Sequence, residues 1–361
     1  MTVIWHVSSH GWGHAARQRE LMLAFREQFH NAEVIVASDV PRWFWRGTGI
    51  TGIVRGSPSP TVEESGWEID LAATRKKLMD FLDRLDSLLA EELKFHEDLG
   101  VDLVVSDIDP LPVAAASAAG IPAFGIGNFT WDWILAELFP DLKLDIARVS
   151  LLYSKGTYLR LPMGPPGHNP FKTTVDVPLL ASGHCSDTRE VRHLFTNGLL
   201  CLVALRELPP GGLPDLPQGF LALSSSPEPL SSGILNITPK ELSSRGLVFS
   251  DLVAAADVVI SKAGYGIISQ ILALGKPCVL LTGRGFPEER FLLEHMRERN
   301  TTVILKPGEE RDLSCHVRRA VSEPLPAREA ADGAEFILSQ GYLDPFDRTA
   351  HQATQPRVPR S

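Results

Sequence analysis

A histidine- and glycine-containing segment near the start of the chain is the first candidate for chemistry. Residues 8–14 read Ser-Ser-His-Gly-Trp-Gly-His and separate an apolar run from a helical pattern. Gly11 and Gly13 would let the backbone approach a ligand closely, and His14 would stand where the helix begins, as a general base. Arg17, one turn later, could bind a phosphate or carboxylate. The alternative is that the two histidines bond only to the backbone at the start of the helix.

A carboxylate after a second apolar run could support that histidine. Asp107 follows Leu103–Val105, so we expect it at the carboxyl edge of the same parallel sheet as His14. Its side chain could hold the second imidazole nitrogen, fix the tautomer and stabilise the cation formed on proton abstraction. The alternative is that Asp107 or Asp109 caps the helix that begins at Pro110–Pro112.

A third polar segment, residues 128–133, combines hydrogen-bonding groups with two tryptophans after the expected strand Ala123–Ile126. Aromatic faces can cover the apolar face of a sugar while amide and carboxylate groups bond its hydroxyls. Packing of the tryptophans at a domain interface explains the pattern equally well. The candidates for the cleft and the acceptor are Gly11, Trp12, Gly13, Arg17, Asn128, Trp131 and Asp132.

The strongest segment is a second glycine-containing turn, residues 261–270. It follows the apolar run Val258–Ile260 and precedes a helical pattern over Ile267–Leu274. The backbone amides of residues 264–267, the helix dipole and Lys262 would together hold a diphosphate. Side chains in the first turn of the helix could reach ribose hydroxyls. The alternative is a packing turn without a ligand.

Residues 283–290 follow the next expected strand and should therefore face the same ligand. Carboxylates there suit hydrogen bonds to sugar hydroxyls, although acidic residues also favour the start of any helix. The donor-binding candidates are Lys262, Gly264, Tyr265, Gly266, Ile267, Ser269, Gln270, Arg284, Glu288 and Glu289.

Composition narrows the class of protein. The chain has 361 residues and a net charge of -9, which disfavours nucleic acid as a partner. Cys185, Cys201, Cys278 and Cys315 lie far apart without a CxxC pair, so we expect reduced thiols and neither a disulfide framework nor a metal site. The chain shows neither a signal-peptide pattern nor an apolar run of membrane-spanning length. This pattern predicts a cytoplasmic protein, and it leaves association with a membrane surface and the oligomeric state open.

Strand and helix patterns alternate, which predicts an α/β protein of doubly wound parallel sheets with ligands at the carboxyl ends of the strands. The expected strands are Val3–Val7, Glu33–Ala37, Leu103–Val105, Ala123–Ile126, Leu199–Ala204, Val258–Ile260, Pro277–Leu281 and Thr301–Leu305. The expected helices are Ala15–Gln28, Asp70–Leu99, Pro112–Ala119, Arg189–Leu194, Phe249–Ala255, Ile267–Leu274, Glu288–Arg299 and Arg328–Gln340.

The domain organisation expected from these patterns has two lobes. Residues 1–182 would form an amino-terminal, acceptor-side lobe with the candidate base, and residues 183–328 a carboxyl-terminal, donor-side lobe. Residues 329–344 would form a closing helix, and residues 345–361 a disordered tail. The Pro- and Ser-rich stretch Pro209–Ser232 predicts little regular structure.

Taken together, the motifs resemble the glycosyltransferase-like amino-terminal domain of L-arabinokinases and stand-alone bacterial proteins of that type. The resemblance covers nearly the whole chain and rests on the collinear order of six motifs. These are Ser9–Arg17, Val105–Asp107, Asn128–Trp133, Val175–Pro178, Gly264–Gly266 and Phe286–Leu292. The chain is similar, more distantly, to peptidoglycan N-acetylglucosaminyltransferases and to a UDP-sugar hydrolase of pseudaminic acid synthesis.

The resemblance implies the GT-B fold, in which two Rossmann-like lobes face a central cleft and the carboxyl-terminal lobe holds most of the nucleotide sugar. It also implies an inverting reaction without a metal or cofactor, with His14 as base and Asp107 as its supporting carboxylate. We therefore expect a glycosyltransferase that moves a sugar from a nucleotide-diphosphate donor, preferably a UDP-sugar, to a small-molecule acceptor with a hydroxyl or amine. The alternatives are a nucleotide-sugar hydrolase, in which His14 activates water, and a non-catalytic sugar-nucleotide-binding protein.

Three departures from the family pattern qualify these expectations. The kinase half that follows this domain in arabinokinases is not in the sequence, so sugar phosphorylation is not expected. Gln270 stands where the family often has Glu, which would alter ribose recognition. Residues 204–210 read Ala-Leu-Arg-Glu-Leu-Pro-Pro in place of the usual glycine pair, which would alter phosphate binding.

An NAD-dependent dehydrogenase is disfavoured. Such enzymes have a GxGxxG turn with an acidic residue about 20 residues further on, and neither glycine turn of this chain fits that pattern.

Overall fold

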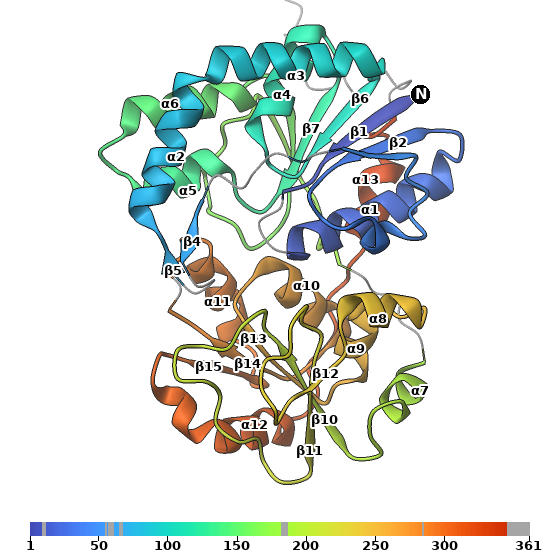
Figure 1. The fold of residues 1–361 in the computed structure, drawn as a ribbon, viewed down its shortest axis with the longest axis vertical. Coiled ribbons are helices and arrows are strands. Elements are labelled where there is room, and N and C mark those ends of the chain that lie inside the picture. Colours follow the sequence, from blue (N-terminus) through green and yellow to red (C-terminus); the bar gives the residue numbers. More distant parts are fainter. Residues whose placement is uncertain are drawn as a thin grey trace, which may run out of the picture. The chain divides into compact units, whose positions relative to one another are not determined.

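The computed structural model describes residues 1–8, 12–54, 56, 61–64, 68–181, 187–283 and 285–344. The chain divides into two compact units (Figure 1). Unit 1 comprises Met1–Val62, Leu71–Leu180 and Asp332–Ser361, and unit 2 comprises Glu63–Asp70 and Ala181–Ala331. The boundary expected between residues 182 and 183, and the tail expected at 345–361, lie outside the described residues.

Unit 1 is built on a seven-stranded parallel sheet with the strand order β3-β2-β1-β6-β7-β8-β9. Its central strands are mostly apolar because helices cover both faces, and Val3, Ile4 and Trp5 are fully buried. The strands are β1 Thr2–His6, β2 Glu33–Ala37, β3 Gly52–Val54, β6 Leu103–Ser106, β7 Ala123–Gly127, β8 Thr157–Arg160 and β9 Thr173–Asp176.

Two helices of unit 1, α5 Trp131–Leu138 and α6 Lys143–Tyr153, were not expected, and the others differ from expectation at three places. The helices of unit 1 are α1 Trp12–Gln28, α2 Leu71–Asp83, α3 Leu85–Leu99, α4 Pro110–Ala119, α5 Trp131–Leu138, α6 Lys143–Tyr153 and α13 Gly333–Ser339, with a short 3-10 turn η1 at Arg42–Trp45. The single helix expected over Asp70–Leu99 is two helices separated at Arg84. A straight helix of that length would be about 45 Å long, more than a domain of this size can keep in contact with its core. The bend keeps leucines of both helices in one buried cluster.

The other two differences concern where helices begin. Helix α1 starts at Trp12, three residues before the expected start, so Gly13 and His14 lie in its first turn. Helix α13, red in Figure 1, is shorter than the expected Arg328–Gln340 and packs against α1. Residues 328–332 are not helical, and the Glu329 N–H donates to the Leu272 carbonyl at 3.0 Å.

Unit 2 holds a six-stranded parallel sheet with the order β12-β11-β10-β13-β14-β15, and a short antiparallel pair, β4–β5. The strands are β4 Glu63–Glu64, β5 Glu68–Ile69, β10 Leu199–Ala204, β11 Phe220–Ser224, β12 Leu235–Asn236, β13 Val258–Lys262, β14 Cys278–Leu281 and β15 Thr302–Leu305. The helices are α7 Thr188–His193, α8 Pro239–Ser244, α9 Phe249–Ala255, α10 Tyr265–Leu274, α11 Glu289–Arg297 and α12 Leu313–Ser322, with a 3-10 turn η2 at Glu309–Asp312.

Strand β11 corrects the expectation of little regular structure through residues 209–232. It pairs in parallel with β10, with Leu199 opposite Phe220. Five residues are enough for an edge-proximal strand, but the Pro and Ser residues on both sides hide so short an apolar run from a pattern-based prediction.

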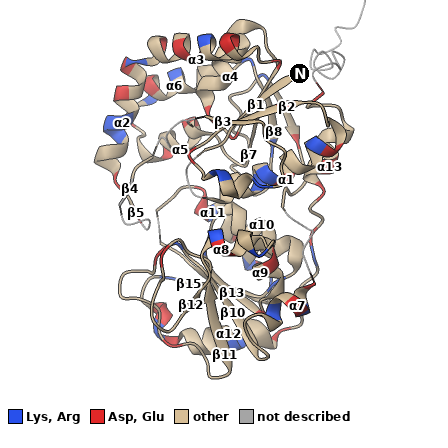
Figure 2. Ribbon diagram, turned by 45° about the vertical axis from the view of Figure 1, so that its right-hand side comes forward, with Lys and Arg blue, Asp and Glu red and all other residues tan. Residues whose placement is uncertain are grey.

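The buried thiols and the charged residues of the surface are typical of a globular protein. Burial raises the pKa of both Cys201 and Cys278, which makes these thiols unreactive. Basic and acidic residues both occur along α2 and α3 (Figure 2), where Lys76–Asp80 and Lys94–Asp98 form i,i+4 ion pairs. Within the described residues, each helix is too short or too polar to cross a bilayer.

Candidate functional site

The register of the central strands brings the segment with His14 and the segment with Asp107 to one edge of the unit 1 sheet. Strands β1 and β6 run parallel with His6 opposite Ser106, so the residues that follow each strand leave the sheet side by side. The N–H of Asp107 donates to the carbonyl of His6 at 2.7 Å. This hydrogen bond places the Asp107 side chain at the carboxyl edge, where α1 begins.

The structure brings His14 and Asp107 into direct contact. His14 Nδ1 lies 2.6 Å from Asp107 Oδ2. An ionised carboxylate can only accept, so this contact favours the neutral tautomer with its hydrogen on Nδ1 and its lone pair on Nε2. Arg17 Nη2, which can only donate, lies 2.9 Å from the same Nδ1, farther than the carboxylate oxygen. The capping alternative belongs to the neighbouring carboxylate, since Asp109 Oδ1 accepts from Leu111 N–H at 3.0 Å at the start of α4.

Two further side chains of α1 hold the same carboxylate. Arg17 Nε donates to Asp107 Oδ1 at 2.9 Å, and Gln18 Nε2 donates to the same oxygen at 3.2 Å. Gln18 Oε1 in turn accepts from Trp5 Nε1 at 2.9 Å. Positions 14, 17 and 18 share one face of α1 because they are three or four residues apart. Sequence reasoning missed Gln18 and Trp5, although the i,i+4 spacing from His14 was a usable signal for Gln18.

The charge of Asp107 depends on two opposing effects, its burial and its charged neighbours. Asp107 is fully buried, and burial alone would raise the pKa of its carboxyl. The charges and hydrogen bonds of Arg17 and His14 outweigh that effect and lower the pKa of Asp107 to about 2. Asp107 is therefore an anion at neutral pH, and the Arg17 guanidinium, expected to meet a ligand, compensates this buried charge.

The backbone next to Asp107 is strained. Ile108 has φ 58, in the left-handed region that β-branched residues rarely adopt. Its carbonyl accepts from the Tyr153 hydroxyl at 2.5 Å. A Cβ on Gly127 would collide with Ile108 Cγ2, so glycine is needed at that position of β7. The strain and its supports fix the direction in which the Asp107 side chain leaves the sheet.

The aromatic segment after β7 is largely internal. Trp131 and Asp132 are buried, and Asp132 Oδ2 accepts from Ser150 Oγ at 2.6 Å and lies 3.1 Å from His168 Nε2. Asn128 Oδ1 is 3.4 Å from Arg17 Nη1, at the margin of the His14 cluster. Packing and internal hydrogen bonds are enough to explain why these side chains are here. That they contact an acceptor stays a prediction.

The remaining acceptor-side candidates lie at the start of α1. Trp12 packs edge-to-face against Trp43 and Phe44, with ring centroids 5.5 and 5.9 Å apart. Gly13 is inside the helix, and Gly11 lies outside the described residues. Their role toward an acceptor also stays a prediction.

In unit 2, the donor candidates gather where β13 leads into α10. Gly264 is the N-cap of α10, so Tyr265 and Gly266, expected in the turn, are the first helical residues. A Cβ on Gly264 would meet nothing within 4 Å, so a side chain at this N-cap position would enter open space. The first N–H groups of a helix point along its axis and carry its positive dipole end, which makes this a suitable place for an anion.

The other donor candidates lie deeper in unit 2. Ser269 Oγ donates to the Gly266 carbonyl at 3.0 Å, inside its own helix. Gln270 is buried, and its Oε1 has no hydrogen-bond partner among the described residues. Glu289, in the first turn of α11, accepts from the Gly283 N–H at 3.4 Å.

Four donor candidates remain. Glu288 is the N-cap residue of α11 and, like Glu289, is buried. Ile267 is partly exposed on α10, and Arg284 lies outside the described residues. Lys262 is the last residue of β13 and is partly exposed. The structure thus brings Lys262, Gly264 and the first turn of α10 together at one strand end.

Comparisons with solved structures identify the fold. Over 98% of both chains, the structure resembles the spinosyn forosaminyltransferase SpnP with a TM-score of 0.58 and 15% identity. It also resembles the glycosyltransferase SsfS6 of Streptomyces sp. SF2575 complexed with thymidine diphosphate, with a TM-score of 0.58 and 17% identity, over 94% of this chain and 99% of that one. Two Rossmann-like parallel-sheet units of this kind define the α/β GT-B fold.

One curated relative matches at the level of sequence. L-arabinokinase of Arabidopsis thaliana is 28% identical over 321 residues, which cover 80% of this chain and 29% of that protein. The chain therefore spans less than a third of the length of this relative. No protein-family model matches the chain.

Proposed function

We propose that the protein is an inverting, metal-independent glycosyltransferase that uses a nucleotide-diphosphate sugar, preferably a UDP-sugar. The observation that carries this proposal is the 2.6 Å contact between His14 Nδ1 and Asp107 Oδ2 at the carboxyl edge of the unit 1 sheet. A buried carboxylate that fixes an imidazole tautomer is the arrangement that a general base needs.

In the proposed reaction, His14 Nε2 removes the proton from an acceptor hydroxyl or amine. The acceptor oxygen or nitrogen then forms a bond to the anomeric carbon while the bond from that carbon to the diphosphate oxygen breaks. The bonding electrons leave with the diphosphate, and a single displacement of this kind inverts the anomeric configuration. Asp107 stabilises the imidazolium that results, and Arg17 keeps Asp107 ionised.

The donor site proposed for unit 2 is the start of α10. A phosphate would bind to the first N–H groups of the helix, and a Cβ on Gly264 would meet nothing within 4 Å. Lys262, at the end of β13, adds a positive charge beside them. These groups would stabilise the charge that develops on the leaving diphosphate, which is the step a metal ion supports in other enzymes. The thymidine diphosphate in the SsfS6 structure supports the assignment of this ligand class.

The experiment is a two-stage assay on purified protein. First, UDP, TDP, GDP and their common sugar conjugates are screened for an increase in Tm, because a ligand of the folded state stabilises it by mass action. Second, each stabilising donor is incubated with and without a panel of sugar, lipid and amine acceptors, in the presence of EDTA. The products are identified by mass spectrometry.

We expect one nucleotide class to raise Tm and a new glycoside to form only when an acceptor is present. Free sugar formed at the same rate without an acceptor would identify a hydrolase instead. Binding without either product would identify a nucleotide-sugar-binding protein, and the absence of any Tm shift would overturn the proposal.

A further inference from the structure

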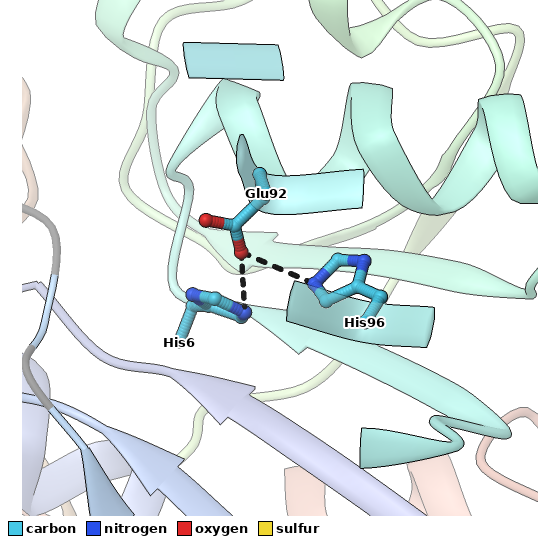
Figure 3. A group of neighbouring side chains, drawn as sticks. All are labelled: His6, Glu92 and His96. Carbon is cyan, nitrogen blue, oxygen red and sulfur yellow. Dashed lines mark ion pairs between the residues drawn. The ribbon is translucent and has the colours of Figure 1, made fainter. Parts of the chain in front are cut away.

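A second cluster of chemically active side chains lies in unit 1, apart from the residues proposed for sugar transfer. It joins His6, the last residue of β1, to Glu92 and His96, which are four residues apart on α3 (Figure 3). His6 Nε2 lies 3.3 Å from Glu92 Oε1, and His96 Nε2 lies 3.1 Å from the same oxygen. The i,i+4 spacing puts Glu92 and His96 on one face of the helix.

The cluster is buried but not satisfied by hydrogen bonds. His96 is fully buried, His6 is 3% exposed, and the Glu92 side chain is 16% exposed. Among the described residues, no hydrogen-bond partner is present for Glu92 Oε1 or for either nitrogen of the two imidazoles. The nitrogens are close to the carboxylate oxygen, yet neither ring directs an N–H at it. Each buried polar group left in this state costs about 1–3 kcal/mol.

The spacing of these atoms suits a shared metal ion. With metal–ligand bonds of about 2.0–2.1 Å, two ligand atoms of a tetrahedral site lie about 3.3–3.4 Å apart. The two nitrogen–oxygen distances, 3.1 and 3.3 Å, are close to that value, and all three ligand atoms lie within 4.8 Å of one another. If the lone pairs of both imidazoles and of the carboxylate point at one metal position, no ring N–H can point at the carboxylate. A shared ion would therefore explain the missing hydrogen bonds.

The three side chains are of the kinds that bind transition metals. Two imidazoles and one carboxylate form a donor set that favours zinc over magnesium or calcium.

We propose that His6 Nε2, Glu92 Oε1 and His96 Nε2 bind one divalent transition-metal ion, with zinc as the expected occupant. Glu92, with its side chain 16% exposed, is the member of the trio nearest to solvent. The ion would tie β1 to α3 and stabilise unit 1. This proposal does not depend on the proposed glycosyl transfer, and an ion bound there would contradict the expectation from sequence that the chain has no metal site.

The first test measures metal binding by the wild-type protein. Protein stripped with a chelator and exchanged into metal-free buffer is titrated with Co²⁺, which reports four-coordinate binding by its visible absorption, and then with Zn²⁺. We expect one equivalent of Co²⁺ to bind without the thiolate charge-transfer band that a cysteine ligand would add. We also expect Zn²⁺ to displace the Co²⁺ and to raise Tm.

The second test uses variants. Glu92→Gln and His96→Gln should each weaken Zn²⁺ binding more than about 100-fold, because even changes outside the ligand set commonly cost 10–100-fold. His30→Gln is the matched control, since His30 is an exposed histidine of the same unit. Circular dichroism of each metal-free variant checks that the fold is retained, and the nearly isosteric Glu92→Gln is the variant most expected to retain it.

The absence of one-to-one binding to the wild-type protein would overturn the proposal and leave a metal-free polar trio. Binding that survives unchanged in both Glu92→Gln and His96→Gln would overturn it as well, because the ion would then bind elsewhere. Binding lost in His30→Gln as strongly as in the other variants would have the same consequence.

Discussion

The main-chain N–H of Asp107 donates to the carbonyl of His6 at 2.7 Å. This hydrogen bond joins the two polar clusters of unit 1, because the side chain of His6 belongs to the proposed metal site and that of Asp107 holds His14. The backbone positions of Asp107, which supports the candidate base, and of His6 in the proposed metal site are therefore tied together by two adjacent parallel strands, β1 and β6.

Asp107→Asn should abolish most turnover. The asparagine amide would donate to His14 Nδ1 and so favour the tautomer in which Nε2 carries the hydrogen and cannot act as a base. An analogous change in a serine protease costs about 10⁴-fold in kcat, and we expect a loss of about 1000-fold or more here. Asp109→Asn is the matched control, since asparagine caps a helix as well as aspartate does. Equal turnover of the two variants, measured by product formation, would contradict the account.

The Asp107 carboxyl should make stability depend on pH at the acid end. Its pKa is about 2 in the folded state against an ordinary value of 3.8, so the folded state binds this proton more weakly than the unfolded state does. The corresponding stability is complete above about pH 4 and is lost as the pH falls toward 2, with a total of about 2 kcal/mol. Urea unfolding of the wild type and Asp107→Asn should show a stability difference that shrinks over this range. A constant difference would disprove the assignment.

Gly127→Ala should impair catalysis as well as stability. The new Cβ would collide with Ile108 and displace the strained backbone next to Asp107. Gly125→Ala, two residues earlier on β7, would meet the Phe171 ring instead. We expect both variants to lose about 1–3 kcal/mol of unfolding free energy in urea titrations, but only Gly127→Ala to lose turnover at a temperature where both are folded. A parallel loss in both would mean that the strain has no role in positioning Asp107.

Gly264→Val should block nucleotide binding without unfolding unit 2. Gly264 has an extended backbone that valine adopts readily, φ -128 and ψ 145, and its Cβ would point into open space. The isopropyl group would occupy the place proposed for a phosphate. We expect the affinity for the stabilising nucleotide diphosphate, measured by calorimetry, to fall at least about tenfold, while Tm without ligand stays within a few degrees. Gly233→Val, at another open glycine of unit 2, should change neither quantity.

Ser269→Ala tests a residue for which sequence and structure give different indications. The sequence places Ser269 in reach of a ribose, whereas its hydroxyl bonds the Gly266 carbonyl within α10. From this contact we expect nucleotide affinity to change less than about twofold in the same calorimetric measurement. A loss of tenfold or more would restore the ribose-binding assignment.

The sequence predicted the parts of the fold that depend on strong local patterns. Apolar runs such as Val258–Ile260 identified the central strands, since a parallel strand buried on both faces has no alternation to misread. The short strand β11 and the break at Arg84 were missed because each depends on packing between elements distant in sequence. The GT-B fold itself was expected from the resemblance, and the structural comparisons confirm it.

The site could be predicted only where strand ends alone decide which residues meet. His14 and Asp107 follow strands that lie side by side, so their proximity could be anticipated. The choice between Asp107 and Asp109 could not, because it depends on the left-handed backbone of Ile108 between them. The cluster of His6, Glu92 and His96 was invisible for a similar reason, since only the packing of α3 against the sheet brings the two chain segments together.

The measurement that tests the central claim most directly separates binding from chemistry in His14→Gln. The affinity of this variant for the nucleotide-diphosphate donor is measured by calorimetry and its turnover by product formation, both beside the wild type. Because His14 belongs to unit 1 and the proposed diphosphate site to unit 2, the account predicts affinity within about twofold of the wild type and turnover reduced about 1000-fold or more. Turnover close to that of the wild type, in a variant that still binds the donor, would contradict the account.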